Sequence, residues 1–170
     1  MYSRLSNRIH RKRARPEKGF SLVELLIVVT VILIIAAIAI PNFITSKMRA
    51  TESGAIQNLR TITTANVVYS TTFSVGFSPD LASLGGDASA PTQSAAGLID
   101  SILASGSKSG YNYTYSVVSA DGNGQVTGYV IFANPSIPGT TGTRYFYTDE
   151  TAVIRYNTTT QAGPTDLPIS

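Results

Sequence analysis

The sequence predicts an α+β protein in which a long N-terminal helix packs against an antiparallel sheet of roughly four strands. Three patterns support this prediction. A mostly apolar run covers residues 20–40, apolar residues at steps of three and four continue to residue 73, and the last third alternates apolar and polar residues between turn signals. One long helix followed by several strands is typical of an α+β fold.

The apolar run over residues 20–40 is long enough, as a helix, to cross the hydrocarbon core of a bilayer, about 30 Å thick. Its single charged residue is Glu24. A carboxylate at this depth costs roughly 2.5–3.5 kcal/mol, so Glu24 requires a cationic partner. Positions 20 and 24 share one helix face, so an amino group on residue 20 could pair with Glu24 within a chain or between staggered neighbours.

The segment before the run is strongly basic. Lys and Arg dominate residues 1–18, where Glu17 is the single acid. Basic residues that flank a span stay in the cytoplasm, so we expect a cytoplasmic N-terminus and an exported remainder. The whole chain has a formal net charge of +3, but the part after residue 18 is mildly acidic and has no basic stripe, so direct binding of nucleic acid is not expected.

The junction reads Gly-Phe-Ser-Leu-Val-Glu at residues 19–24 and resembles the N-terminus of type IV prepilins and type II secretion pseudopilins. The resemblance covers residues 16–45. It implies that a membrane peptidase cleaves between Gly19 and Phe20 and methylates the new N-terminal Phe20. The cation required by Glu24 would then be a freed Phe20 amino group. We expect its pairing with a neighbour's Glu24 to set the register of assembled subunits.

The resemblance also implies a pilin-like fold and a structural role in a type IV pilus-type surface filament. The subunit would first be a single-pass protein of the bacterial inner membrane, with its N-terminus in the cytoplasm, and would then enter an extracellular pilus. Its implied partners are other copies of itself, the prepilin peptidase and methyltransferase, and an inner-membrane assembly platform with an ATPase motor. A pseudopilin of type II secretion, part of a periplasmic piston for protein export, carries the same signature and remains the alternative.

Two simpler interpretations of the N-terminus also remain. The basic segment, the apolar core and the small residues 37–39 fit an ordinary secretory signal peptide, and an uncleaved signal anchor is also conceivable. Neither explains Glu24. The first residue of the mature protein separates the three, because it would be Phe20 after prepilin cleavage, Ile40 after signal cleavage and Met1 for an anchor.

The helix is predicted to continue beyond Pro41, which lacks an N–H donor and should kink or soften it near the membrane surface. We therefore assign Pro41, together with Phe20 and Glu24, to assembly. A mostly apolar stripe then follows at helical spacing: Ile44, Met48, Ala55, Leu59, Ile62, Asn66, Tyr69 and Phe73. We expect this stripe to pack on the sheet. The opposite face, expected to meet neighbouring subunits, holds Lys47, Glu52, Gln57, Asn58 and Arg60.

Four later segments have the pattern of half-buried strands. In residues 111–117 tyrosines alternate with small polar residues, which we interpret as sheet packing rather than ligand stacking. An Asp-Gly-Asn-Gly turn at 121–124 joins this strand to the next in a hairpin. The predicted strands are 111–117, 126–133, 144–148 and 151–156.

Less regular structure is expected between the long helix and the sheet, with a short turn or helix at 78–84 and a short helix at 98–103. The predicted organisation, in chain order, is a cleaved basic leader (1–19), a transmembrane or filament-core helix (20–41), its amphipathic continuation (42–75), a variable loop region (76–110) and an antiparallel sheet with a C-terminal tail (111–170).

The sequence offers no catalytic constellation. The chain has no cysteine, and its single histidine, His10, lies in the leader. Triads with histidine, cysteine nucleophiles and His or Cys metal centres are therefore excluded from a chain that starts at Phe20. Asp121 and Asn123 offer oxygen ligands, but an EF-hand needs further acids, so a hairpin turn explains them better. We expect no enzymatic activity, no cofactor and no metal site.

The lack of cysteine departs from the family pattern, in which a disulfide often bounds a C-terminal loop. That end of the protein must instead be closed by packing, hydrogen bonds or a metal.

A membrane-tethered binding module that never polymerises is a further functional class. The genetic neighbourhood, with a retraction motor or with secretion components, would discriminate among these functions.

Overall fold

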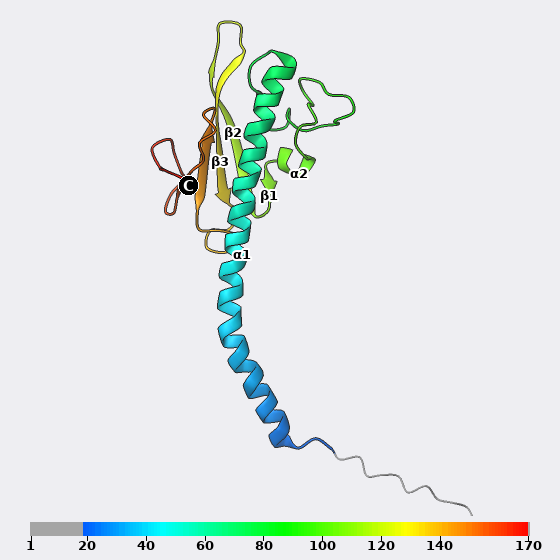
Figure 1. Ribbon diagram of the computed structural model, residues 1–170, viewed down its shortest axis with the longest axis vertical. Coiled ribbons are helices and arrows are strands. Elements are labelled where there is room, and N and C mark those ends of the chain that lie inside the picture. Colours follow the sequence, from blue (N-terminus) through cyan, green and yellow to red (C-terminus); the bar gives the residue numbers. More distant parts are fainter. Residues whose placement is uncertain (1–18, 170) are drawn as a thin grey trace, which may run out of the picture. The chain divides into compact units, whose positions relative to one another are not determined.

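The computed structural model describes residues 19–169, so the predicted leader over residues 1–18 lies outside the described residues. The chain forms two compact units, Met1–Ile40 and Pro41–Ser170. Helix α1, Leu22–Phe73, contributes to both. In its described part the first unit contains the start of α1, and the second unit, called the head, contains the rest of α1 and all the strands (Figure 1).

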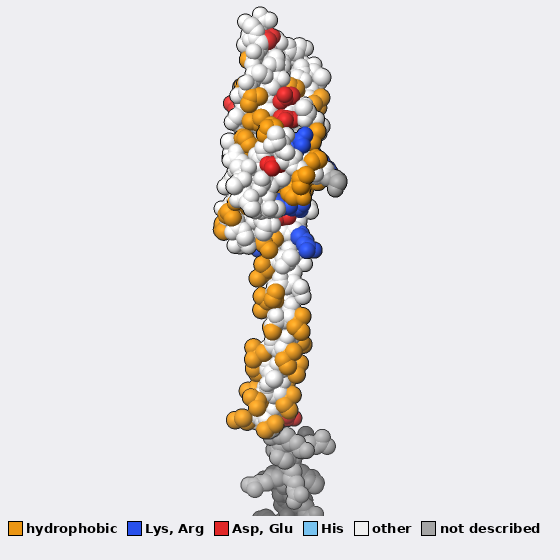
Figure 2. All heavy atoms as spheres, turned by 90° about the vertical axis from the view of Figure 1, so that its left-hand side faces the viewer, with side chains coloured by type: hydrophobic (Ala, Val, Ile, Leu, Met, Phe, Trp, Pro, Cys, Tyr) orange, Lys and Arg blue, Asp and Glu red, His pale blue; other side chains and the backbone are white. Residues whose placement is uncertain are grey.

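The part of α1 in the first unit is apolar on all sides. It is long and apolar enough to cross a membrane, and none of its most apolar window is buried in the structure. Figure 2 shows one face of the molecule, on which hydrophobic side chains (orange) cover most of this part of the helix. Its polar Thr30 donates its hydroxyl to the Leu26 carbonyl at 2.7 Å, so this hydroxyl is satisfied within the helix.

The head contains one antiparallel sheet whose six strands follow each other in chain order. The strands are β1 (Ser107–Lys108), β2 (Tyr111–Ala120), β3 (Val126–Pro135), β4 (Tyr145–Asp149), β5 (Arg155–Asn157) and β6 (Leu167–Pro168). The α+β prediction is confirmed, with two more strands than expected. The two additional strands, β1 and β6, have two residues each, which is too short to show an alternating pattern.

The head half of α1 packs against the sheet and forms one core with it (Figure 1). Leu59 and Ile62 of α1 are fully buried together with Tyr111, Ile131 and Phe146 of the sheet. The predicted apolar stripe is therefore confirmed from Ala55 to Tyr69. Its first member, Ile44, is exposed, because the buried residues of α1 begin only at Glu52.

The β2–β3 hairpin has the predicted turn. Asp121 accepts hydrogen bonds on Oδ1 from the amides of Asn123 and Gln125, at 2.9 and 2.8 Å. Gly124 has a φ of 80°, which glycine adopts without strain. Asp121 Oδ1, considered above as an oxygen ligand, thus accepts hydrogen bonds from the turn itself.

Two other predicted elements are displaced. The last predicted strand, 151–156, starts only at Arg155, because Ala152 closes a turn with its amide on the Asp149 carbonyl at 3.0 Å. The short helix predicted at 98–103 is α2, Ser101–Ala104, which begins after the side chain of Asp100 caps the amide of Leu103.

Candidate functional site

The predicted cleavage site lies in non-helical backbone just before α1. Gly19 and Phe20 precede the helix, which starts at Leu22. Phe20 is 87% exposed, and a Cβ added at Gly19 would meet no atom within 4 Å. The peptide bond between these two residues is therefore open to an approaching protein.

Ser21 and Glu24 form a capping box at the start of α1. The Ser21 amide donates to Glu24 Oε2 at 3.0 Å, and Ser21 Oγ accepts the Val23 amide at 3.3 Å. The Ser21 carbonyl accepts the first helical hydrogen bond, from Leu25, at 3.2 Å. This arrangement satisfies exposed amides at the helix start and turns the Glu24 carboxylate back toward its own N-terminus.

The structure thus brings two of the predicted site residues, Phe20 and Glu24, to the same end of α1. Ser21 is the residue that sequence reasoning missed, although its position three residues before a glutamate is a known helix-start signal. Pro41, the other residue assigned to assembly, lies inside α1, and its carbonyl accepts the Thr45 hydroxyl at 3.1 Å. The roles of Gly19, Phe20, Glu24 and Pro41 in processing and assembly stay predictions.

In the head, Glu52 lies where the sequence analysis did not expect it. We expected it on the outward face of α1, but it is only 4% exposed. Its Oε1 accepts the Thr143 amide at 2.8 Å, the Thr143 hydroxyl at 3.0 Å and the Arg144 amide at 3.2 Å, and its Oε2 accepts Arg144 Nε at 2.7 Å. Glu52 therefore fastens the segment before β4 to α1. The signal was present, because Glu52 fills the gap at helical spacing between Met48 and Ala55.

Two opposing effects act on the Glu52 carboxyl. Burial by itself would raise its pKa, but the hydrogen bonds from Thr143 and Arg144 outweigh burial, so the pKa lies below its ordinary value of 4.5. The guanidinium of Arg144 also lies over the rings of Phe146 and Tyr156, at 5.5 and 5.6 Å from their centroids. These contacts keep both charges in place at the edge of the core.

Asn58 is the second polar residue that was wrongly placed on the outward face. It is buried and donates through Nδ2 to the Tyr113 hydroxyl at 2.9 Å. Burial raises the pKa of Tyr113 to about 12. Tyr111 and Tyr113 both point into the core, as their alternation predicted, and hydrogen bonds to Arg144 and Asn58 satisfy their hydroxyls.

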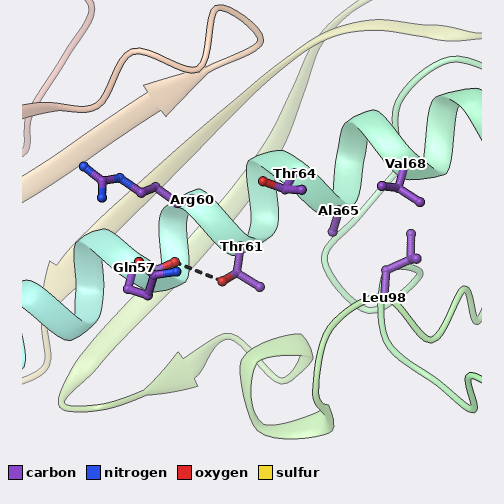
Figure 3. Close-up of a pocket in the computed structure, with 7 residues that line it drawn as sticks. All are labelled: Gln57, Arg60, Thr61, Thr64, Ala65, Val68 and Leu98. Atoms are coloured by element: carbon purple, nitrogen blue, oxygen red, sulfur yellow. Dashed lines mark hydrogen bonds between the residues drawn. The ribbon is translucent and has the colours of Figure 1, made fainter.

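The outward face of α1 in the head borders two shallow grooves. Figure 3 shows the larger, about 270 Å³, in which the side chains of Val68 and Leu98 point toward each other beside Ala65. Its lining comprises Gln57, Arg60, Thr61, Thr64, Ala65, Val68 and Leu98. The second groove, about 230 Å³, shares Arg60 and Thr64 with the first and also contacts Ala152 and Ile154. Gln57 and Arg60 are exposed here, as expected.

The C-terminal loop is closed by hydrogen bonds. Asp166 accepts Asn157 Nδ2 at 3.0 Å and the Gly163 amide at 2.8 Å, and its carbonyl accepts Arg155 Nη1 at 2.9 Å. The Ile169 amide also bonds to the Ile154 carbonyl at 2.9 Å. Among residues 19–169, no group of three or more His, Cys, Asp or Glu side chains is arranged to hold a metal ion.

Two comparisons with known proteins give matches, and each covers less than a third of the chain. A family model described as the prokaryotic N-terminal methylation motif matches residues 14–40. The type IV major pilin protein PilA of Myxococcus xanthus (strain DK1622) is 54% identical over 48 residues, which is 28% of this chain and 22% of that protein. The match thus spans about a fifth of the relative's length. No solved structure gives a significant match.

Proposed function

We propose that this chain is a structural subunit of a type IV pilus-type surface filament. The match to the N-terminal methylation motif and the similarity to a type IV pilin support this proposal. The observation that carries this proposal is the combination of the methylation motif with an exposed apolar helix that contains Glu24 close to its start. A helix of this kind is stable in a bilayer, and the same apolar surface can be buried among copies of itself in a filament core.

Processing would supply the partner that Glu24 lacks in lipid. Cleavage between Gly19 and Phe20 by a prepilin peptidase frees the Phe20 amine, which becomes methylated and remains cationic. In the filament the Glu24 carboxylate pairs with the Phe20 amine of a neighbouring subunit. Because an unpaired carboxylate costs roughly 2.5–3.5 kcal/mol in the membrane, this pairing favours docked subunits over misaligned ones.

The head would cover the outside of the filament. The outward face of α1 in the head borders the two grooves that share Arg60 and Thr64. This face is available to neighbouring subunits. An inner-membrane platform with an ATPase motor would move subunits from the membrane into the filament and back. In this proposal the subunit has no enzymatic role.

A pseudopilin of a type II secretion system is the second candidate, because heads without a cysteine-bounded loop, as in this chain, occur among pseudopilins. It would use the same membrane storage, processing and Glu24 pairing, but in a short periplasmic filament. Shearing the cells separates the two functions. A pilus subunit is recovered as the main protein of long sheared fibres, whereas a pseudopilin stays with the cells.

The decisive variant is Glu24→Leu. We expect it to insert into the membrane as wild type does, because leucine is better tolerated there, and to form no filaments. The readouts are membrane fractionation and electron microscopy of sheared material. Glu150→Gln is the matched control, since it removes an exposed acid of the head and should leave filaments unchanged. Abundant normal filaments from Glu24→Leu would refute the proposed pairing.

A further inference from the structure

We propose that the end of the head at which α1 enters it is a docking surface for the headgroups of anionic phospholipids. Its contacts are the exposed cations Lys47 and Arg49, in a neck of α1 over residues 45–51, and the exposed Ile137 of the loop between β3 and β4. The inference rests on the membrane-stored subunit of the proposed function, and it requires neither cleavage nor a filament.

The neck separates the apolar surface of α1 from its buried face. Ile44 is still 47% exposed, whereas the buried residues of α1 begin at Glu52. At about 1.5 Å per residue, Lys47 is about 4.5 Å and Arg49 about 7.5 Å beyond Ile44 along the helix. The headgroup layer on each side of a bilayer is about 5–7.5 Å thick. Both cations therefore fall at the level of the lipid phosphates when the membrane span ends at Ile44.

The charges of Lys47 and Arg49 are unmatched within the head. Both side chains are exposed, and neither forms an ion pair or a side-chain hydrogen bond with another residue of the range 19–169. Glu52, the acid that follows them in sequence, is buried and accepts Arg144 Nε at 2.7 Å, so its charge is already compensated. Figure 2 shows basic side chains (blue) at this end of the head. Such a surface attracts anionic headgroups.

The placement of the two cations around the helix favours lipid over a protein partner. Successive helical residues are rotated by about 100°, so Lys47 and Arg49 lie about 200° apart around α1. Arg49 is three residues before Glu52 and therefore lies on the side of the sheet, whereas Lys47 lies on the outward side. A second copy of the chain on one side of α1 would meet one of these charges. The headgroup layer surrounds the helix and meets both.

The loop between β3 and β4 lies at the same end of the head (Figure 1). The Thr51 hydroxyl donates to the Thr141 carbonyl, which holds this loop beside the neck. The Thr141 amide donates to the Ile137 carbonyl at 2.9 Å, and the Ile137 amide donates to Thr141 Oγ1 at 3.1 Å, so the loop has a fixed form. Ile137 is nevertheless 58% exposed. Its apolar side chain can enter the interfacial layer in which Lys47 and Arg49 bind phosphate.

The test measures how close this loop lies to the lipid headgroups. The full chain is reconstituted at low density into vesicles of phosphatidylcholine and phosphatidylglycerol that contain a lipid with a nitroxide on its headgroup. Because the chain has no cysteine, Thr140→Cys places a single fluorophore on the exposed part of the loop. Time-resolved fluorescence then separates docked heads, which the nitroxide quenches, from undocked ones. A label on Asn123→Cys, in the β2–β3 turn, should be quenched little.

The decisive variant combines Lys47→Gln with Arg49→Gln. We expect the ratio of docked to undocked heads to fall about fivefold for each basic residue removed, and to fall similarly in wild type when phosphatidylglycerol is left out. Exchanging the two cations, Lys47→Arg with Arg49→Lys, should preserve docking, which separates lost charge from altered folding. Arg60→Gln is the matched control, because Arg60 is an exposed cation of α1 outside the neck, and it should leave the quenching unchanged.

Flotation of the vesicles reports membrane insertion separately. A chain that does not float with the vesicles would overturn the stored subunit of the proposed function together with the docking. A chain that floats, but whose quenching is the same in wild type and in the double glutamine variant, would overturn the docking alone. Quenching that appears only at high protein density would assign this surface to a second copy of the chain and would also overturn the docking to lipid.

Discussion

Glu52 shows how one buried carboxylate can organise the edge of the head. Four donors from Thr143 and Arg144 surround it, so its charge is compensated without water. A buried ion pair such as Glu52 and Arg144 adds little net stability compared with a well-packed pair of apolar side chains. Removing the carboxylate, however, leaves buried donors without an acceptor. Glu52 therefore joins α1 to the segment before β4 in one specific arrangement.

We predict that Glu52→Gln lowers the free energy of unfolding of the head by about 2 kcal/mol at neutral pH, because the amide cannot accept from all four donors and loses the ion pair with Arg144. Denaturant unfolding of the full chain in detergent measures this. Lys108→Met is the control. Its ion pair with Asp100 has side chains that are 32% and 47% exposed, so it should cost less than about 1 kcal/mol. An equal loss in the two variants would argue against a special role for Glu52.

The difference in stability between wild type and Glu52→Gln should depend on pH. Because the folded-state pKa of Glu52 lies below 4.5, the unfolded chain binds this proton at higher pH than the folded chain does. The stabilisation is fully present above the unfolded-state pKa and is lost as pH falls through the folded-state pKa. The stability difference between wild type and Glu52→Gln should therefore narrow below pH 4.5 and stay constant above about pH 6.

Among the elements, α1 combines two environments in one helix. None of its residues 22–40, in the first unit, is buried. Its part in the head has a buried face from Glu52 to Tyr69. The first part is long and apolar enough to cross a membrane, whereas the second part is stabilised by packing on the sheet.

The loop between β5 and β6 is an element whose closure depends on one side chain. The Asp166 carboxylate accepts hydrogen bonds from Asn157 Nδ2 and the Gly163 amide, and the Asp166 backbone carbonyl accepts one from Arg155 Nη1. In a chain without cysteine, these contacts perform the closing role that a disulfide would have. They are reversible, so the loop should open more readily than a covalent one.

We predict that Asp166→Ala raises the rate of proteinase K cleavage within residues 158–166 about tenfold, because charge-assisted hydrogen bonds worth about 1.5–3 kcal/mol are lost. Mass spectrometry of the fragments identifies the cut. Asp87→Ala provides the comparison, since Asp87 is exposed and its side chain bonds only to neighbouring Ser89. If both variants were cut in this loop at the same rate, Asp166 would not be what closes it.

For the whole molecule, the proposed cleavage reverses the sign of the charge. The complete chain has a sequence pI of about 9.3, and its basic residues concentrate in residues 1–18. The exported protein would be acidic, which reduces its attraction to nucleic acid and to anionic lipid.

We predict that isoelectric focusing shows two forms of this chain, a basic precursor and a mature form that focuses below neutrality. Cells that lack the prepilin peptidase should contain only the basic form, and Edman or mass-spectrometric analysis of the acidic form should begin with N-methylated Phe20. A mature form that starts at Ile40 would identify a conventional signal peptide instead.

The sequence by itself determined the fold class, the apolar helix and the β2–β3 hairpin, because local periodicity and turn chemistry are enough to specify them. Gly19 and Phe20 became candidate residues through the resemblance of residues 19–24 to prepilins, and Glu24 through that resemblance and as the single charge in the apolar run. Local patterns could not give strands β1 and β6, because two residues are too few to show an alternating pattern. Nor could they reveal the late start of β5, which the turn at Ala152 decides.

Only the tertiary structure decided which polar residues are buried. Glu52 and Asn58 look like surface residues in the sequence, and their burial is possible only because Arg144 and Tyr113, far along the chain, supply matching hydrogen-bonding groups. A polar side chain reveals its own donors and acceptors but not its partners. Whether it enters a core depends on what the rest of the fold brings to it.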